Sequence, residues 1–182
     1  MENTTVAAAI DDLRFPVGKF DKSVEMTPEM RAEFIQIIAD LPKKLAEGVE
    51  GLNEEQLDTP YRPDGWTLRQ TVHHVADSHM NSLTRFKLAL TEENPTIRPY
   101  YEDRWAELAD NKLPVKVSLK IIEGVHQRWT ALLESLTDED FQKPLMHPDS
   151  GQWSVEGFLA LYAWHSRHHT AHITRLRQRN GW

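Results

Sequence analysis

No cysteine occurs among the 182 residues of this sequence. Its absence excludes disulfide bonds, thiolate zinc sites and a cysteine nucleophile, so any thiol that takes part in chemistry must belong to a substrate. The sequence also has no run of about 18 apolar residues and no basic segment near its start, so it predicts neither a membrane span nor a secretion signal. We therefore expect a cytoplasmic protein without a membrane partner.

Positive charge is scarce as well. The sequence holds 21 Lys and Arg against 28 Asp and Glu, which gives a formal net charge of −7. Proteins that bind nucleic acids usually present a basic face to the phosphates, so we expect no nucleic-acid partner. The basic cluster near the C-terminus, Arg175, Arg177 and Arg179, is typical of the last turns of a helix.

Nothing in the composition divides the chain into separate parts. Hydrophobic residues make up 40% of it and charged residues 27%, without a low-complexity tract. A chain of this length is enough to bury one full core. We predict a flexible N-terminal segment over residues 1–12 and a single domain over residues 13–182.

Helical periodicity is present in four segments, at about 27–49, 67–91, 117–135 and 154–179. The first opens with Thr27 before Pro28, and the second with Thr67 three residues before Gln70, which are N-cap and capping-box patterns. Prolines break the chain between the second and third segments, where only a short helical piece over 101–108 is expected. The pattern predicts an all-α protein.

The connections after the first and third helical segments resemble each other. Leu52 and Trp66 in the first connection match Leu136 and Trp153 in the second, at offsets of 84 and 87 residues, so the second copy has three extra loop residues. We interpret this as a duplicated helical hairpin. Two such hairpins predict a four-helix bundle with approximate two-fold symmetry, and such bundles build metal sites from facing helices.

Four of the nine histidines fall within eight residues of the last helical segment: His165, His168, His169 and His172. His165 and His169 are four residues apart and lie within about 20° of the centre of the apolar stripe, whereas the other two lie farther from it. Buried ring nitrogens need partners, and two neutral imidazoles on one face can share a divalent cation. The sequence therefore favours His165 and His169 as ligands.

A third ligand is expected from the second helical segment, which contains His73, His74 and His79. Periodicity alone favours His79, because it lies on the apolar stripe and His74 lies about 120° away. A face that lines a metal is itself polar and need not follow the stripe, so both stay candidates at this point. Three imidazoles without cysteine are typical of a catalytic metal site.

Several motifs together resemble the YfiT-like branch of the DinB superfamily. The resemblance extends from about Leu13 to Trp182 and is carried by the runs Gly65-Trp66-Thr67-Leu68-Arg69-Gln70, His73-His74-Val75-Ala76-Asp77-Ser78-His79, Arg98-Pro99-Tyr100, Arg128-Trp129-Thr130, His147-Pro148-Asp149 and Tyr162-Ala163-Trp164-His165-Ser166. It implies a four-helix bundle with down-up-up-down topology. It also implies one divalent ion per chain, zinc or nickel, bound by His74, His165 and His169, and thus selects His74 over His79.

The activity implied by the resemblance is that of a metal-dependent hydrolase. Low-molecular-weight thiol S-transferases of the bacillithiol-dependent kind belong to the same superfamily and form the first alternative; a metal-binding bundle without turnover is the second. An open position on the metal activates either water or a small thiol of the substrate. The resemblance further suggests a homodimer, for which Trp105, Trp129 and residues 94–100 could form an interface or belong to the core.

The groups around the ligands are less well defined by the sequence. Asp77 lies one turn after His74 and could orient its imidazole, as carboxylates behind metal ligands do. It is more simply a polar residue on a helix surface. His79, His168 and His172 flank the same region, and no general acid or base is identified.

Overall fold

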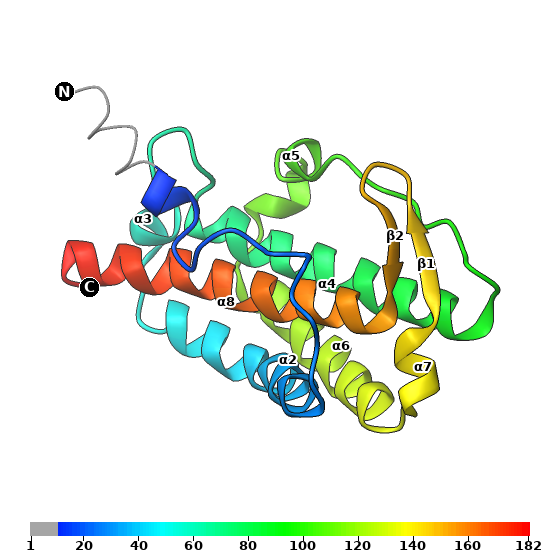
Figure 1. Ribbon diagram of the computed structural model, residues 1–182. Coiled ribbons are helices and arrows are strands. Elements are labelled where there is room, and N and C mark those ends of the chain that lie inside the picture. The colour runs from blue at the N-terminus through cyan, green and yellow to red at the C-terminus, as the bar shows by residue number, and fades with distance from the viewer. Residues whose placement is uncertain (1–10) are drawn as a thin grey trace, which may run out of the picture.

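Four long helices form the body of the protein in the computed structural model, which describes residues 11–182 (Figure 1). They are α2 (Pro28–Val49), α4 (Leu68–Thr91), α6 (Lys116–Glu134) and α8 (Val155–Asn180). The four predicted helical segments are confirmed, with ends that differ by one residue. Residues 1–10 of the predicted flexible segment lie outside the described residues, and residues 11 and 12 belong to a helical turn. The single-domain assignment stays a prediction.

The helices begin where the sequence places N-cap residues. The Thr27 side chain accepts a hydrogen bond from the Met30 amide before α2. Thr67 and Gln70 form a reciprocal capping box at the start of α4. These side chains satisfy amide groups that have no partner inside the first helical turn, and they fix the register of the helices that carry the histidines.

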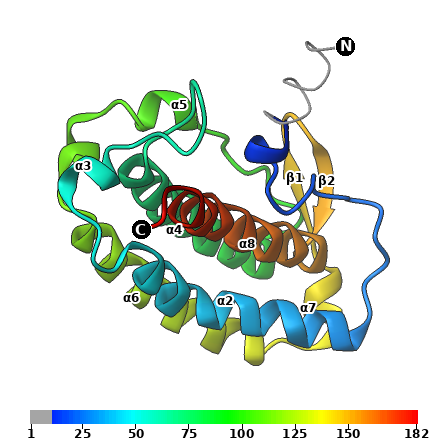
Figure 2. The ribbon, with the colours of Figure 1, turned by 90° about the vertical axis from the view of Figure 1, so that its left-hand side faces the viewer.

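The bundle has the down-up-up-down order. Helices α2 and α8 run in one direction and α4 and α6 in the other (Figure 1). Both α2 and α4 pack against α6 and α8 (Figure 2), so the two helices of each sequence repeat lie on a diagonal of the bundle. The second helices of the two repeats, α4 and α8, are therefore neighbours, and their facing sides can build one site.

The connections across the two diagonals repeat each other in structure. Each starts with a short helix that has its own capping box, α3 (Glu54–Leu57) and α7 (Asp138–Gln142). An antiparallel bridge between Pro60 and Thr67 follows α3, and its counterpart after α7 pairs Pro144 with Ser154. The three extra residues of the second copy extend that bridge into a hairpin of β1 (Pro144–His147) and β2 (Gly151–Ser154).

The proline-rich connection between α4 and α6 is fixed to this hairpin. Ile97 donates its amide to the Met146 carbonyl, and Met146 donates to Pro95, both at 2.9 Å. The short helix α5 (Glu102–Trp105) and the 3-10 turn η1 (Ala109–Lys112) follow, roughly where a helical piece over 101–108 is predicted. Pro95 and Ile97 are buried, which assigns part of residues 94–100 to the core.

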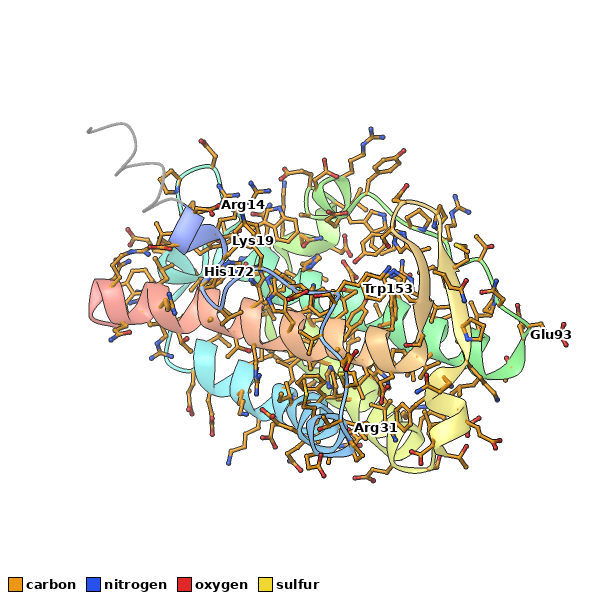
Figure 3. The ribbon with its side chains drawn as sticks, viewed as in Figure 1. Arg14, Lys19, Arg31, Glu93, Trp153 and His172 are labelled. Carbon is orange, nitrogen blue, oxygen red and sulfur yellow. The ribbon has the colours of Figure 1, made fainter. Side chains whose placement is uncertain are left out.

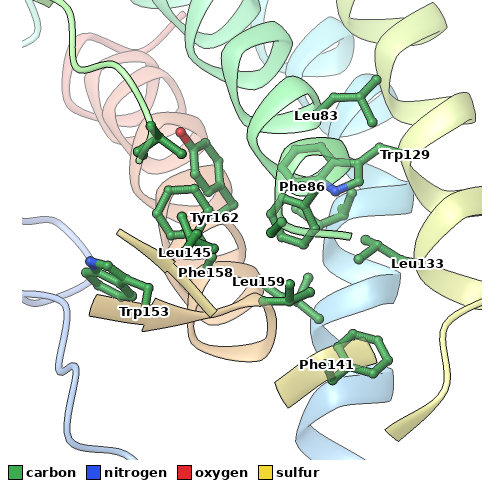
Figure 4. Packing of buried hydrophobic residues seen from close by; sticks show 14 residues of the cluster. Leu83, Phe86, Trp129, Leu133, Phe141, Leu145, Trp153, Phe158, Leu159 and Tyr162 are labelled. Carbon is green, nitrogen blue, oxygen red and sulfur yellow. The ribbon is translucent and has the colours of Figure 1, made fainter. Parts of the chain in front are cut away.

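The hydrophobic core is divided between the two ends of the bundle, and aromatic side chains fill the end near the hairpin (Figure 4). Trp129 is fully buried there against Phe86, with ring centroids 5.1 Å apart. Trp129 is thus a core residue rather than interface material. Trp105 is half-buried and packs on Tyr100. Over residues 11–182, no helix combines the length and apolarity that a bilayer crossing requires.

Candidate metal centre

The rings of His74, His165 and His169 meet where α4 faces α8. One potential ligand atom from each ring lies within 4.8 Å of the others. The Nε2 atoms of His74 and His165 are 3.2 Å apart. Two nitrogens at about 2.0–2.1 Å from one zinc ion would be about 3 Å apart, so this spacing fits shared coordination. The structure brings together the three histidines that the sequence and the resemblance select.

A line of hydrogen bonds runs from His165 across the bundle and involves all four long helices. His165 Nδ1 lies 3.0 Å from His79 Nε2, and His79 Nδ1 lies 2.8 Å from His126 Nε2. His126 Nδ1 is 2.5 Å from the carbonyl oxygen of Ile38 in α2. We call His165, His79, His126 and the Ile38 carbonyl the histidine relay.

The Ile38 carbonyl determines the tautomer of every ring in this relay. A carbonyl can only accept, so His126 carries its proton on Nδ1, and its Nε2 accepts from His79 Nδ1. By the same step His79 Nε2 accepts from His165 Nδ1, which leaves the lone pair of His165 on Nε2. That nitrogen is the one beside His74. The relay therefore presents a ligand nitrogen to the site.

The proline inside α2 explains why the Ile38 carbonyl is available. In an α-helix this carbonyl would accept from the amide four residues later, which belongs to Pro42. Proline has no N–H, so the carbonyl lacks its helical partner. His126 supplies the missing donor from α6. The sequence feature that weakens α2 is thus the origin of the histidine relay.

The site histidines are uncharged in this environment. Burial lowers the pKa of His74 to about 4, with a smaller contribution from His168, and burial lowers the pKa of His126 to about 4. Burial also holds the pKa values of His79, His165 and His169 well below the usual value for histidine. A metal ion binds neutral imidazole, so the triad is in the required protonation state at neutral pH.

A second histidine cluster overlaps the first on α8. It consists of His168, His169 and His172, whose Nδ1 atoms are buried without a hydrogen-bond partner among the described residues. His172 lies close to Arg14 (Figure 3), and its Nε2 donates to the Arg14 carbonyl at 3.2 Å. The His172 ring stacks on Tyr61 with centroids 3.8 Å apart. His172 therefore fastens the segment at residues 11–14 over α8.

His73 and Asp77, which lie near His74 on α4, have simpler explanations than metal binding. His73 bonds Ser118 Oγ through Nδ1 and the Leu113 carbonyl through Nε2, so it is a satisfied core histidine. Among residues 11–182, the polar side-chain contact that the structure gives His74 is with His165, and no hydrogen bond joins His74 to the Asp77 carboxylate. Burial raises the pKa of Asp77 to about 6, with a smaller contribution from Asp110. A role for Asp77 in orienting His74 thus receives no support from the geometry.

The triad opens onto a polar pocket of about 650 Å³. Its walls come from the loop before α4, the loop before α5, the start of the described chain and the hairpin. Arginines, carboxylates and aromatic rings line it together with the histidines, among them Arg62, Trp66, Arg85, Tyr100, Glu102, Asp149 and Tyr162. Trp66 packs on His74 with ring centroids 4.5 Å apart, so one wall of the pocket also supports a ligand.

Sequence reasoning missed His126 and Arg85. His126 is the sole histidine of α6, so no local spacing connects it with the other histidines. Pro42 inside a predicted helix was the available signal, because it marks a carbonyl that needs a donor. Arg85 lies in a helical segment with many polar residues, and only the fold shows that it is buried in the pocket wall.

Comparisons with known proteins extend over most of the chain. Residues 29–173 match the family model described as the DinB superfamily. The chain is 57% identical over 173 residues to proteins of Bacillus cereus and Bacillus anthracis that carry the name "Putative metal-dependent hydrolase"; the match covers 95% of this chain and 100% of each relative. A Bacillus thuringiensis protein with the same name is 56% identical over that length.

The fold is also similar to that of a solved structure, described as YfiT from Bacillus subtilis, "a probable metal-dependent hydrolase with an unusual four-helix bundle topology". The TM-score is 0.90 at 49% sequence identity. The similarity covers 94% of this chain and 99% of the other.

Proposed function

The chain belongs to the DinB superfamily, and from this premise we propose that it is a metal-dependent hydrolase whose divalent ion is bound by His74, His165 and His169. The observation that carries the proposal is the histidine relay. It places the lone pair of His165 on Nε2, 3.2 Å from His74 Nε2 at the wall of the pocket. The names of the relatives support the class of reaction.

The second cluster is a weaker candidate for the same ion. His168, His169 and His172 all come from one helix, and His172 is already engaged with Arg14 and Tyr61. The first triad joins two helices and has a ring whose tautomer is determined by its surroundings. We therefore assign the ion to the first triad. His168 lines the same pocket, and His172 holds the Arg14 segment and Tyr61.

When bound, zinc or nickel would act as a Lewis acid that lowers the pKa of a water molecule in an open position to about 7. The chain's own residues prepare the site for this. Histidine rings supply neutral nitrogens, His79 holds the Nδ1 proton of His165, and Trp66 covers His74. Within residues 11–182, no carboxylate joins the triad as a fourth ligand, which supports open positions and turnover over a purely structural ion.

Metal analysis of purified variants tests this assignment. His74→Ala should lose the stoichiometric metal that the unmodified protein holds, because two ligands on one helix remain. His168→Ala and His172→Ala are matched controls on α8 and should keep it. Metal retained by His74→Ala but lost from His79→Ala or His172→Ala would contradict the assignment.

The nucleophile is open to a separate test. We expect hydrolysis by activated water; the alternative is transfer to a small thiol. Conjugation of monochlorobimane to a low-molecular-weight thiol, dependent on added metal and abolished in His74→Ala, would favour the S-transferase. The homodimer also stays a prediction, which sedimentation equilibrium measures directly.

A further inference from the structure

Two arginines of α4 are buried, and they differ in their partners. Arg69 is 6% exposed and pairs with two carboxylates, Asp58 at 2.6 Å and Glu54 at 2.5 Å. Arg85 is 8% exposed. Within residues 11–182 it forms no ion pair, and its hydrogen bonds go to the Tyr162 hydroxyl at 3.4 Å and the Arg98 carbonyl at 2.8 Å. Both of these partners are uncharged.

A buried guanidinium without a counter-ion is unfavourable. Removing a charge from water is costly, and the cost is recovered only when an opposite charge is close. Arg31 shows how this chain normally meets the requirement, because it pairs with Glu156 and Asp138. Glu102 and Asp149 line the same pocket as Arg85 but do not pair with it. The charge of Arg85 is therefore available to something that enters the pocket.

Arg85 and the histidine triad face the same pocket. Tyr162 lies between them: its hydroxyl accepts from Arg85, and its ring centroid is 5.5 Å from that of His165. The guanidinium also lies over the Tyr100 ring, 5.8 Å from its centroid. It has five N–H donors, and the structure occupies two of them. The free donors can meet a molecule that reaches the triad.

We propose that Arg85 binds an anionic group of the substrate, a carboxylate or a phosphate, while the reacting group occupies the metal site. The planar fork of a guanidinium matches both oxyanions, with two parallel hydrogen bonds. The inference rests on the proposed function only in taking this pocket as the substrate pocket. It limits the substrate class to small anionic molecules.

The test uses metal-free protein, so that it does not depend on the metal assignment. We would measure the urea midpoint with inorganic phosphate or acetate, against sodium chloride at the same ionic strength. Both the unmodified protein and Arg69→Met should gain stability from at least one of the two anions. Arg85→Met should bind that anion about 10- to 100-fold more weakly, because a hydrogen bond to a charged group is lost. The phosphate and acetate arms distinguish the two oxyanions.

Stability without anions separates a binding role from a structural one. Arg69→Met should lower the urea midpoint because it removes the hydrogen bonds that join α4 to Glu54, Asp58 and the Leu113 carbonyl. Arg85→Met should leave the midpoint unchanged or raise it. Arg85→Gln provides a second variant of similar size if the methionine variant does not fold. The proposal is overturned if neither anion stabilises the unmodified protein beyond chloride, or if Arg85→Met and Arg85→Gln respond as the unmodified protein does. Metal content measured on the same preparations reports separately on the histidine triad.

Discussion

At the scale of single residues, the tautomer of His165 depends on groups that are far from it in sequence. His165 Nδ1 donates its proton to His79, and His79 donates to His126. His126 in turn donates to the Ile38 carbonyl, which is 88 residues away in the sequence. Hydrogen bonds behind a metal ligand commonly change metal affinity by 10- to 100-fold. The relay should therefore be measurable as metal affinity, although His126 lies outside the triad.

Replacing His126 by Phe should weaken metal binding by about 10- to 100-fold, because His79 loses the acceptor that holds its tautomer. Competition with a chromophoric chelator measures the affinity. His73→Phe is the matched control: it removes another buried histidine with two hydrogen bonds, and it should cost stability while leaving affinity unchanged. Equal affinities in His126→Phe and the unmodified protein would show that the relay does not act on the metal.

The sequence pattern alone identified some of the candidate ligands but not all of them. The pair His165 and His169 followed from spacing on one helix, because residues four apart share a face. The choice between His74 and His79 did not follow from periodicity, and the fold shows why: both lie against His165, one on each ring nitrogen. His126 and Arg85 could not be found from local pattern, because their roles arise from contacts between helices.

At the scale of secondary-structure elements, Pro42 links the stability of α2 to the metal site. A proline inside a helix removes one hydrogen bond and costs about 3 kcal/mol relative to alanine. Here the carbonyl that it frees accepts from His126 instead. The helix is weakened at the position where the histidine relay ends.

Pro42→Ala should raise the urea midpoint and lower metal affinity together. The new amide at position 42 would donate to the Ile38 carbonyl and so stabilise α2. It would compete there with His126 and weaken the hydrogen bond at the end of the relay. Denaturation and chelator competition measure the two effects. Pro28→Ala is the matched control, because Pro28 is at the first helical position, where no intrahelical acceptor exists. If Pro42→Ala raised the urea midpoint without changing the metal affinity, Pro42 would have no effect on the metal site.

Element boundaries were largely predictable, whereas the hairpin was not. Caps such as Thr67 with Gln70 determine where a helix begins through contacts within one turn, so the sequence shows them directly. The first copy of the repeat has only the bridge between Pro60 and Thr67 at this place. The second copy is three residues longer and forms a hairpin in which Leu145 pairs with Trp153, and nothing in the residue pattern of the first copy indicates this pairing. Trp153 and Ser154 form the end of β2, and Ser154 is also the N-cap residue of α8, so one short segment belongs to both elements.

At the scale of the whole molecule, the duplication explains how two repeats build a single site. The diagonal arrangement makes α4 and α8 neighbours, so each repeat contributes its second helix. The copies have diverged in charge: Arg69 at the start of α4 pairs with Glu54, whereas the equivalent Glu156 on α8 pairs with Arg31 from α2. Periodicity predicted the bundle, but the down-up-up-down order came from the family resemblance, because helix direction depends on connections that span the diagonal.

The same arrangement buries uncharged histidines between helices, so stability should depend on pH in a defined direction. The pKa of His126 is lowered to about 4 by burial, while the unfolded chain takes up the proton near the ordinary value of about 6.5. Between these values the unfolded state binds more protons, so the stability of the metal-free protein should fall as pH falls from about 6.5 to about 4. His74 and His168, whose pKa values are also lowered to about 4, act in the same direction. Asp77 acts oppositely, since its pKa is raised to about 6.

Urea midpoints of metal-free protein at several pH values between 7 and 4 measure this dependence. His126→Phe should give a shallower dependence, because a difference of about 2.5 pKa units corresponds to on the order of 3 kcal/mol across the window. His147→Gln is the matched control: His147 lies in the hairpin, is less buried than His126 and should change the slope less. A slope that His126→Phe leaves unaltered would mean that His126 is not the buried neutral base on which the tautomer of the whole relay depends.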